Sequence, residues 1–226
     1  MPVISMLTIG QTPRPDISGD LRQLLPSHWE LREYGALDGL TRREAEALCG
    51  YDGQGELLVT RMAGDARQIA LSAEKVFARL QTCITLAEKE GAALHLMACP
   101  GNFPPYFHEK TILYPGVCQR KAALAVDGRV GVLIPNAAQE EQIRGWWATC
   151  GAPHVLLEAA DPFGAAAEIE RAAKELKEQG AEVLCLDCFG YTLEHKAAAE
   201  AASGLPAVLP REVLCQMAKE ELSCLN

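Results

Sequence analysis

Two cysteines each follow a short apolar run and stand just before a glycine. Cys188 lies in AEVLCLDCFGYT (181–192) and Cys99 in AALHLMACPGN (92–102). A free thiol has a pKa of about 8.5, which a helix N-terminus can lower, so a thiolate and a thiol can act as a base and an acid. Inversion at a carbon centre needs such groups on both faces of the substrate. The pair predicts cofactor-free proton transfer, as in a racemase or isomerase.

The alternative is that these cysteines are core residues without a catalytic role, because cysteine is among the most buried residue types. Taken singly, Cys99 or Cys188 is equally well explained as core; their matching placement favours function. Cys185 and Cys188 have CxxC spacing, but residues three apart on a strand face opposite sides, so no metal or redox pair is expected. The histidines lack ligand spacing, so we predict no metal site. We assign seven other cysteines to packing or helix surfaces: Cys49, Cys83, Cys118, Cys150, Cys185, Cys215 and Cys224.

Both cysteines end predicted strands in a chain that alternates strands with helices. The apolar run at 3–10 predicts a central parallel strand, and the runs ending at Cys99 and Cys188 predict later strands of the same kind. Further strands are expected at 29–34, 130–134, 153–158 and 207–209, and helices at 41–49, 72–90, 116–126, 139–149, 162–179, 192–202 and from 211. Residues 57–71 predict a β-hairpin that interrupts the alternation. Residues 100–114, rich in Pro, Phe and Tyr, predict a lid or pocket wall.

The repeated pattern predicts an α/β protein of two pseudo-symmetric parallel-sheet halves, each flanked by helices. We place the first half at 1–127 and 208–226 and the second at 128–207. Each half has a turn suited to an anion after its first strand, with Thr12 or Asn136, and Asp16 is a candidate N-cap for the first helix. A pseudo-twofold axis would bring both cysteines to one cleft. Arg61, in the hairpin, could reach an anionic substrate, although a solvated arginine is the commoner case.

Composition narrows the class of partner. The chain has 226 residues, 21 basic and 30 acidic, for a formal net charge of −9, so we expect neither nucleic acid nor an anionic membrane as a partner. No apolar run approaches the ~20 residues of a membrane span, and the N-terminal residues lack the basic-then-apolar pattern of a signal peptide. The nine cysteines lie mostly in apolar runs and helix-like segments, so we predict that they are reduced and that the protein is cytoplasmic.

Several motifs together resemble the AroM family. They are LTIGQTPRPD (7–16), LLVTRM (57–62), SAEKV (72–76), VGVLIPNAAQ (130–139) and GAEVLCLDCFGYT (180–192). That family is similar to the aspartate/glutamate racemase superfamily, which includes amino-acid and hydantoin racemases, maleate isomerase and arylmalonate decarboxylase. The resemblance implies two pseudo-symmetric α/β halves, no cofactor, and one or two catalytic cysteines at strand ends.

Carried over by position, the resemblance implies Cys99 and Cys188 as catalytic residues. It implies a carboxylate-bearing substrate held by four side chains near them: Thr12, Asn102, Asn136 and Thr192. We predict Gln11, Tyr191 and Arg61 as further substrate contacts, although glutamate racemases have Asp-Ser where Gln11 and Thr12 stand. Phe189 and Gly190 stand where glutamate racemases have Thr-His, so glutamate and aspartate are not favoured. A decarboxylase using one thiol, and a non-catalytic metabolite-binding protein, remain as alternatives. A homodimer is common for the fold.

Overall fold

Two parallel four-stranded sheets organise the chain in the computed structural model, which describes residues 1–65, 67–126 and 128–224. The chain divides into two compact units, Met1–Tyr114 with Leu214–Asn226, and Pro115–Val213. Ala66 and Asp127, at the predicted start of the second hairpin strand and the predicted end of the first half, lie outside the described residues. The halves predicted from the sequence, 1–127 with 208–226 and 128–207, stay a prediction.

The first unit is built on a sheet of order β2-β1-β5-β6. Its strands are β1 (Val3–Thr8), β2 (Glu30–Gly35), β5 (Ala92–Met97) and β6 (Ile112–Leu113). The helices of this unit are α1 (Pro15–Leu24), α2 (Arg42–Cys49), α3 (Ala73–Lys89) and most of α8 (Pro210–Cys224). β1 is central and almost wholly buried, as expected of a strand covered on both faces.

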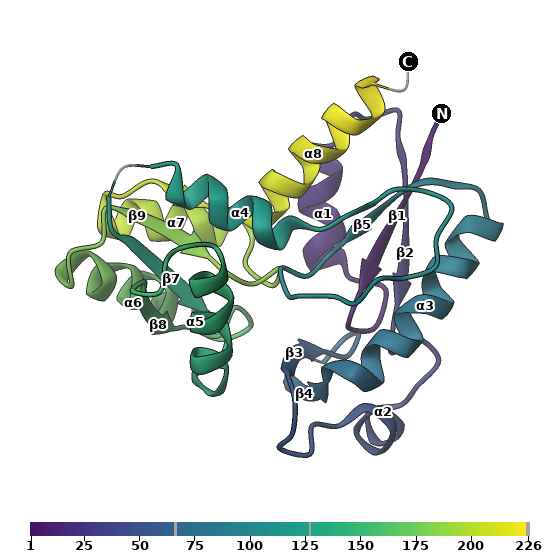
Figure 1. The fold of residues 1–226 in the computed structure, drawn as a ribbon, viewed down its shortest axis with the longest axis horizontal. Helices are drawn as coiled ribbons and strands as arrows, with labels where there is room; N and C mark the ends of the chain where they lie inside the picture. The colour runs from purple at the N-terminus through teal and green to yellow at the C-terminus, as the bar shows by residue number, and fades with distance from the viewer. Residues whose placement is uncertain (66, 127, 225–226) are drawn as a thin grey trace. The chain divides into compact units, whose positions relative to one another are not determined.

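The predicted β-hairpin is confirmed. Strands β3 (Leu57–Arg61) and β4 (Gln68–Ser72) pair antiparallel, and α2 packs against β4 at the same end of the unit (Figure 1). α2 begins with a capping box, in which the Thr41 hydroxyl accepts from the Glu44 N–H and the Glu44 carboxylate accepts from the Thr41 N–H. The hairpin leads straight into the long helix α3.

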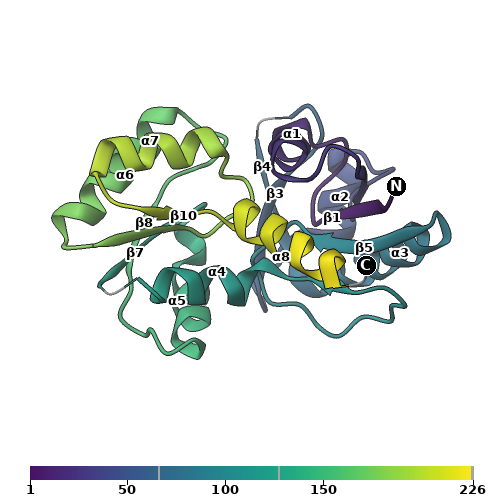
Figure 2. The ribbon, with the colours of Figure 1, turned by 90° about the horizontal axis from the view of Figure 1, so that it is seen from above.

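The second unit repeats the plan with the sheet order β10-β9-β7-β8. Its strands are β7 (Val130–Ile134), β8 (Leu156–Ala159), β9 (Val183–Leu186) and β10 (Ala207–Val208). Helices α6 (Ala166–Glu178) and α7 (Leu193–Ser203) cover one face of this sheet, while α4 (Pro115–Leu124) and α5 (Glu140–Thr149) cover the other (Figure 2). A 3₁₀ turn, η1 (Ala137–Gln139), precedes α5.

The two sheets are equivalent strand for strand, since β2-β1-β5-β6 and β8-β7-β9-β10 give the same order along the chain. Main-chain hydrogen bonds beyond the strand ends repeat as well. The N–H of Ala98 donates to the carbonyl of Leu7 at 2.8 Å, and that of Asp187 donates to Leu133 at 2.9 Å. The predicted α/β fold of two similar parallel-sheet halves is therefore confirmed.

One local expectation needs correction. Asp16 does not cap α1: Arg14 occupies the N-cap position and Pro15 begins the helix, where a missing N–H costs nothing. Within residues 100–114, Ile112–Leu113 forms the short edge strand β6, which is too short to show a sequence period. In the described part of the chain, no helix is long and apolar enough to cross a membrane.

Candidate active site

Cys99 and Cys188 occupy equivalent positions in the two units. Cys99 lies two residues beyond Met97, the last residue of β5, and Cys188 lies two residues beyond Leu186, the last residue of β9. β5 and β9 are equivalent strands, each next to the central first strand of its sheet. Side chains at this carboxyl edge of a parallel sheet are where α/β proteins commonly bind ligands.

The two cysteines also lie on the equivalent face of each sheet. Cys99 belongs to the core cluster that β1 and β5 form with α3, and Cys188 packs against the cluster formed with α6 and α7. α3 and α6 are the helices that precede β5 and β9 along the chain. Cys185 points to the opposite face, toward α4 and α5, so the prediction that Cys185 and Cys188 face opposite sides is confirmed.

The turn that carries Cys188 is tightly fixed. The N–H of Gly190 donates to the Cys188 Sγ at 3.3 Å, and the N–H of Tyr191 donates to the Cys188 carbonyl at 3.3 Å. A Cβ on Gly190 would lie only 2.8 Å from Pro162 Cγ and 2.9 Å from Phe163 Cζ. Only glycine fits there without displacing its neighbours.

Arg211, at the start of α8, holds the same turn from the other side. Its guanidinium is fully buried and donates to the Phe189 carbonyl from Nε (3.1 Å) and Nη2 (2.8 Å). A longer contact of 3.4 Å joins Nη2 to the Gly190 carbonyl, and the guanidinium carbon lies 5.8 Å from the centre of the Phe189 ring. Nothing in the sequence linked Arg211 to Cys188.

Asp187, directly before Cys188, turns its carboxylate into the protein interior. Gln119 donates to Oδ1, Trp147 donates from its indole nitrogen to Oδ2 at 2.8 Å, and the Arg120 Nε lies 3.7 Å from Oδ2. Burial raises the pKa of Asp187, while the positive charge of Arg120 and the hydrogen bonds oppose the rise. The negative charge is thereby neutralised within the α4–α5 layer, on the face opposite that packed by the thiol.

Helix α7 begins soon after Cys188 with a second capping box. The Thr192 hydroxyl accepts from the N–H of His195, and the His195 Nδ1 accepts from the N–H of Thr192 at 3.2 Å. The predicted substrate contact of Thr192 stays a prediction; its hydroxyl retains a hydrogen to donate. No helix follows Cys99 directly, so the two thiols have different surroundings.

An irregular segment, residues 98–111, follows Cys99 instead and is fastened to α3 at two points. Gln81 accepts from the Phe107 N–H and donates to the Phe107 carbonyl, both at 2.8 Å. The Glu88 carboxylate accepts from the N–H groups of Glu109 (2.6 Å) and Lys110 (3.0 Å). The segment is therefore held by hydrogen bonds although it lacks regular structure.

Tyr106, in this segment, packs with Cys99 and places a buried hydroxyl among thiols and rings. Burial raises its pKa, and the neighbouring Tyr114, Cys99 and Cys83 add to the rise, so the phenol stays protonated. Within the described residues, the Tyr106 hydroxyl has no hydrogen-bond partner. It is a donor available near Cys99, and sequence patterns gave no signal for it.

The predicted substrate-binding residues of the first unit make protein contacts in this structure. The Gln11 amide donates to the carbonyl of Leu40 at 2.8 Å and accepts from an N–H of the hairpin. The Thr12 hydroxyl donates to Asp38 at 2.8 Å, and Arg61 pairs with Asp16 at 3.0 Å. Their roles toward a substrate stay predictions.

The remaining predicted contacts differ in exposure. Asn102 is exposed in the segment after Cys99, and Asn136 caps η1 by accepting from the Ala138 N–H at 2.9 Å. Tyr191 is fully buried and donates its hydroxyl to the Ala160 carbonyl at 2.7 Å. Among the residues that the structure describes, no group of three His, Cys, Asp or Glu side chains is arranged to hold a metal ion.

A family model described as AroM protein matches residues 4–222. The chain belongs to the AroM family. The match covers nearly the whole chain, including both strand-end cysteines. No curated protein matches this chain by sequence similarity.

Solved structures share the fold at low identity. Allantoin racemase from Klebsiella pneumoniae matches with a TM-score of 0.70 at 15% identity, covering 99% of this chain and 89% of that one. Glutamate racemase RacE1 from Bacillus anthracis matches at 0.61 and 13%, covering 100% and 83%. A variant of arylmalonate decarboxylase matches at 0.62 and 13%, covering 97% and 92%. The chain therefore shares the fold of these racemases and of the decarboxylase.

Proposed function

We propose that this AroM-family protein is a cofactor-independent racemase or isomerase of a small carboxylate-bearing compound, with Cys99 and Cys188 as its acid/base pair. The observation that carries the proposal is the equivalent placement of the two thiols. Each lies two residues past the strand that is third along the chain in its sheet, β5 or β9, and each lies on the equivalent face of that sheet. A structural role alone gives no reason for the match.

The reaction needs one thiolate and one thiol. The thiolate removes the proton from the carbon next to the carboxylate, and the electron pair of the C–H bond moves into that group to give an enediolate. The thiol then delivers its proton to the opposite face of the same carbon. The net change is inversion at carbon and exchange of roles between the two sulfurs, with no oxidant, metal or cofactor consumed.

The surroundings of the sulfurs support different resting states. The Cys188 Sγ accepts a hydrogen bond from the Gly190 N–H, and Cys188 precedes the N-terminus of α7. Both features favour a negative charge on the sulfur. Asp187 would oppose that charge, but its carboxylate is turned away toward Arg120 and Trp147. Cys99 is buried at 7% exposure, beside the protonated phenol of Tyr106. We assign the resting thiolate to Cys188.

The named activities of the structural relatives support the reaction class. Allantoin, aspartate and glutamate racemases share the fold at 11–15% identity. Their substrates differ, so the fold leaves the substrate of this chain open. Arylmalonate decarboxylase, with the same fold, supports a second candidate in which a single thiol protonates an enediolate after loss of carbon dioxide.

Cysteine replacement separates these functions. Small chiral carboxylates are screened in deuterium oxide for exchange at carbon by proton NMR, with optical rotation followed in parallel. For the compound that reacts, a racemase loses inversion by about 10²–10⁴-fold in both Cys99→Ser and Cys188→Ser. A decarboxylase loses activity in only one of the two and releases carbon dioxide.

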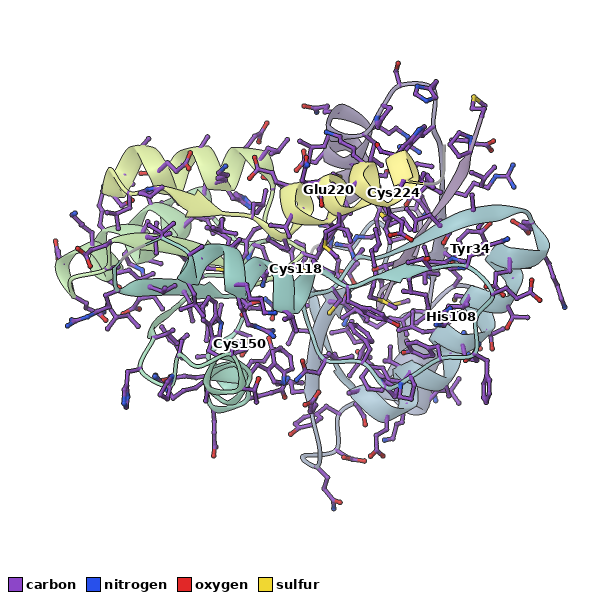
Figure 3. All side chains as sticks on the ribbon, turned by 45° about the horizontal axis from the view of Figure 1, so that its top comes forward. Tyr34, His108, Cys118, Cys150, Glu220 and Cys224 are labelled. Atoms are coloured by element: carbon purple, nitrogen blue, oxygen red, sulfur yellow. The ribbon has the colours of Figure 1, made fainter. Side chains whose placement is uncertain are left out.

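Cys150→Ser is the matched control, because Cys150 is a half-buried cysteine after α5, away from any strand end (Figure 3). It should retain full activity. Activity that survives in both strand-end variants, or saturable binding without any turnover, would contradict the proposed acid/base pair and favour a metabolite-binding protein.

A further inference from the structure

The peptide group between Phe189 and Gly190 is engaged at both ends. Its carbonyl oxygen accepts two hydrogen bonds from the buried guanidinium of Arg211, at 3.1 and 2.8 Å. Its N–H donates to the Cys188 Sγ at 3.3 Å. A fully buried cation and the sulfur of the candidate catalytic cysteine are thus joined through one planar amide.

The geometry of an amide makes these contacts interdependent. The peptide unit is planar and its bond is trans, so the C=O and N–H point in opposite directions. Whatever fixes the carbonyl of Phe189 also fixes the direction of the Gly190 N–H. We propose that Arg211 is a positioning residue that acts through the Phe189–Gly190 peptide to hold and strengthen the hydrogen bond to Cys188. The inference rests on the proposed acid/base role of Cys188.

Charge adds to the effect of position. A cation at the carbonyl end polarises the amide and makes its N–H a stronger donor, since linked hydrogen bonds reinforce one another in a low-dielectric interior. An N–H that donates to sulfur stabilises thiolate more than thiol. Through this amide, Arg211 therefore favours the ionised form of Cys188.

Arginine is suited to this place. Two of its N–H groups converge on one oxygen, and its guanidinium carbon lies 5.8 Å from the centre of the Phe189 ring. Lysine has a single nitrogen and cannot supply both contacts while packing on the ring. The close approach of Pro162 and Phe163 to Gly190 limits any rotation of the turn.

The first test measures alkylation by iodoacetamide against pH, resolved by peptide mass spectrometry, in R211Q and R211K. We expect the midpoint of Cys188 alkylation to rise by about one pH unit in R211Q, a roughly tenfold loss of thiolate at neutral pH, and by less in R211K. Cys150 in the same sample is the reference and should not change. R144Q is the matched control, because the Arg144 guanidinium also donates to a main-chain carbonyl, that of Val155, at 3.0 Å.

A folded R211Q with the Cys188 midpoint of the unsubstituted protein would overturn the inference. If R211Q does not fold, R211K decides in the same way. A second test uses the unsubstituted protein: the Gly190 amide resonance should move with pH in step with thiolate absorbance at 240 nm, and the movement should vanish in C188S. A Gly190 amide resonance that does not move when Cys188 ionises would also overturn the inference. Neither test needs a substrate, so this inference and the proposed reaction can fail separately.

Discussion

Removal of the positive charge beside Asp187 offers a quantitative test of the interior of the second unit. In R120M the Asp187 carboxylate keeps Gln119 and Trp147 as donors but loses the guanidinium whose Nε lies 3.7 Å away. Both side chains are essentially inaccessible to solvent in the native protein. Breaking a buried pair by removing one partner costs about 3–5 kcal/mol in the free energy of unfolding, and we expect that loss at pH 7.5.

The pH dependence of the free energy of unfolding shows whether the charge of Asp187 causes the destabilisation in R120M. Burial already raises the pKa of Asp187 above that of an aspartate in the unfolded chain, about 3.9. The folded protein then binds the proton more tightly, so Asp187 lowers stability as the pH rises from about 4 to its folded pKa. Without Arg120 that pKa rises further, and R120M should regain up to about 1.4 kcal/mol for each pH unit of acidification within this window.

Urea unfolding followed by tryptophan fluorescence at pH 7.5 and 5.0 measures this difference. The double variant R120M/D187L removes both charges and should recover most of the stability lost in R120M, because an apolar pair of similar volume often replaces a buried ion pair at little cost. Equal destabilisation of R120M at both pH values, or strictly additive effects of the two substitutions, would refute the account of a charge-coupled pair.

Substitutions at three other positions test a turn, a helix cap and an ion pair. Gly190→Ala should destabilise the protein by about 1–3 kcal/mol because its Cβ would meet Phe163 Cζ at 2.9 Å; an unchanged urea midpoint would show that the turn is pliable. Thr192→Ala, which removes the cap of α7 shared with His195, should cost about 1 kcal/mol, and Thr192→Ser should restore it. Asp16 has a pKa of about 2: burial opposes the lowering, but the neighbouring arginines outweigh it. Its contribution of about 2 kcal/mol is present above pH 4 and lost toward pH 2, so Asp16→Asn should flatten the acid limb of the stability profile.

The sequence was sufficient for the features that depend on local pattern. Short apolar runs bounded by glycine and proline located the strands, although the strand before Cys188 ends at Leu186, two residues before the cysteine that was expected to end it. Thr41 and Glu44 have the spacing typical of a capping box, and the structure has that capping box at the start of the helix predicted at 41–49. The two-residue period of a strand correctly separated Cys185 from Cys188 on opposite faces.

Features that depend on contacts between distant residues were not predictable. Asp187 meets Gln119 and Trp147, which are 68 and 40 positions away, and no local pattern reports such a pairing. A general signal was available: an aspartate at the end of a fully apolar strand must find a donor or a cation. The same principle applies to Arg211, a fully buried cation at the start of α8 that must also find an acceptor or an anion.

The prediction that Asp16 caps α1 was wrong for a physical reason. Asp16 is a common capping residue, but Pro15 already fits the first helical position, which leaves Asp16 one residue too late. Its carboxylate instead accepts from Arg14 and pairs with Arg61. Arg61, predicted to reach toward an anionic substrate, is therefore held by an anion of the protein itself in this structure.

The attachment of residues 98–111 to α3 has a consequence for ligand binding. Gln81 holds the middle of the segment and Glu88 holds its end, so the chain after Cys99 has already lost much of its freedom before any ligand arrives. A mobile lid loses conformational entropy when a ligand binds, and this loss lowers the affinity. A segment that is already held by hydrogen bonds loses little further entropy on binding. The Cys99 side of the protein is in this sense preorganised, and the exchange rates of its amide hydrogens at Phe107, Glu109 and Lys110 should change little when a carboxylate binds.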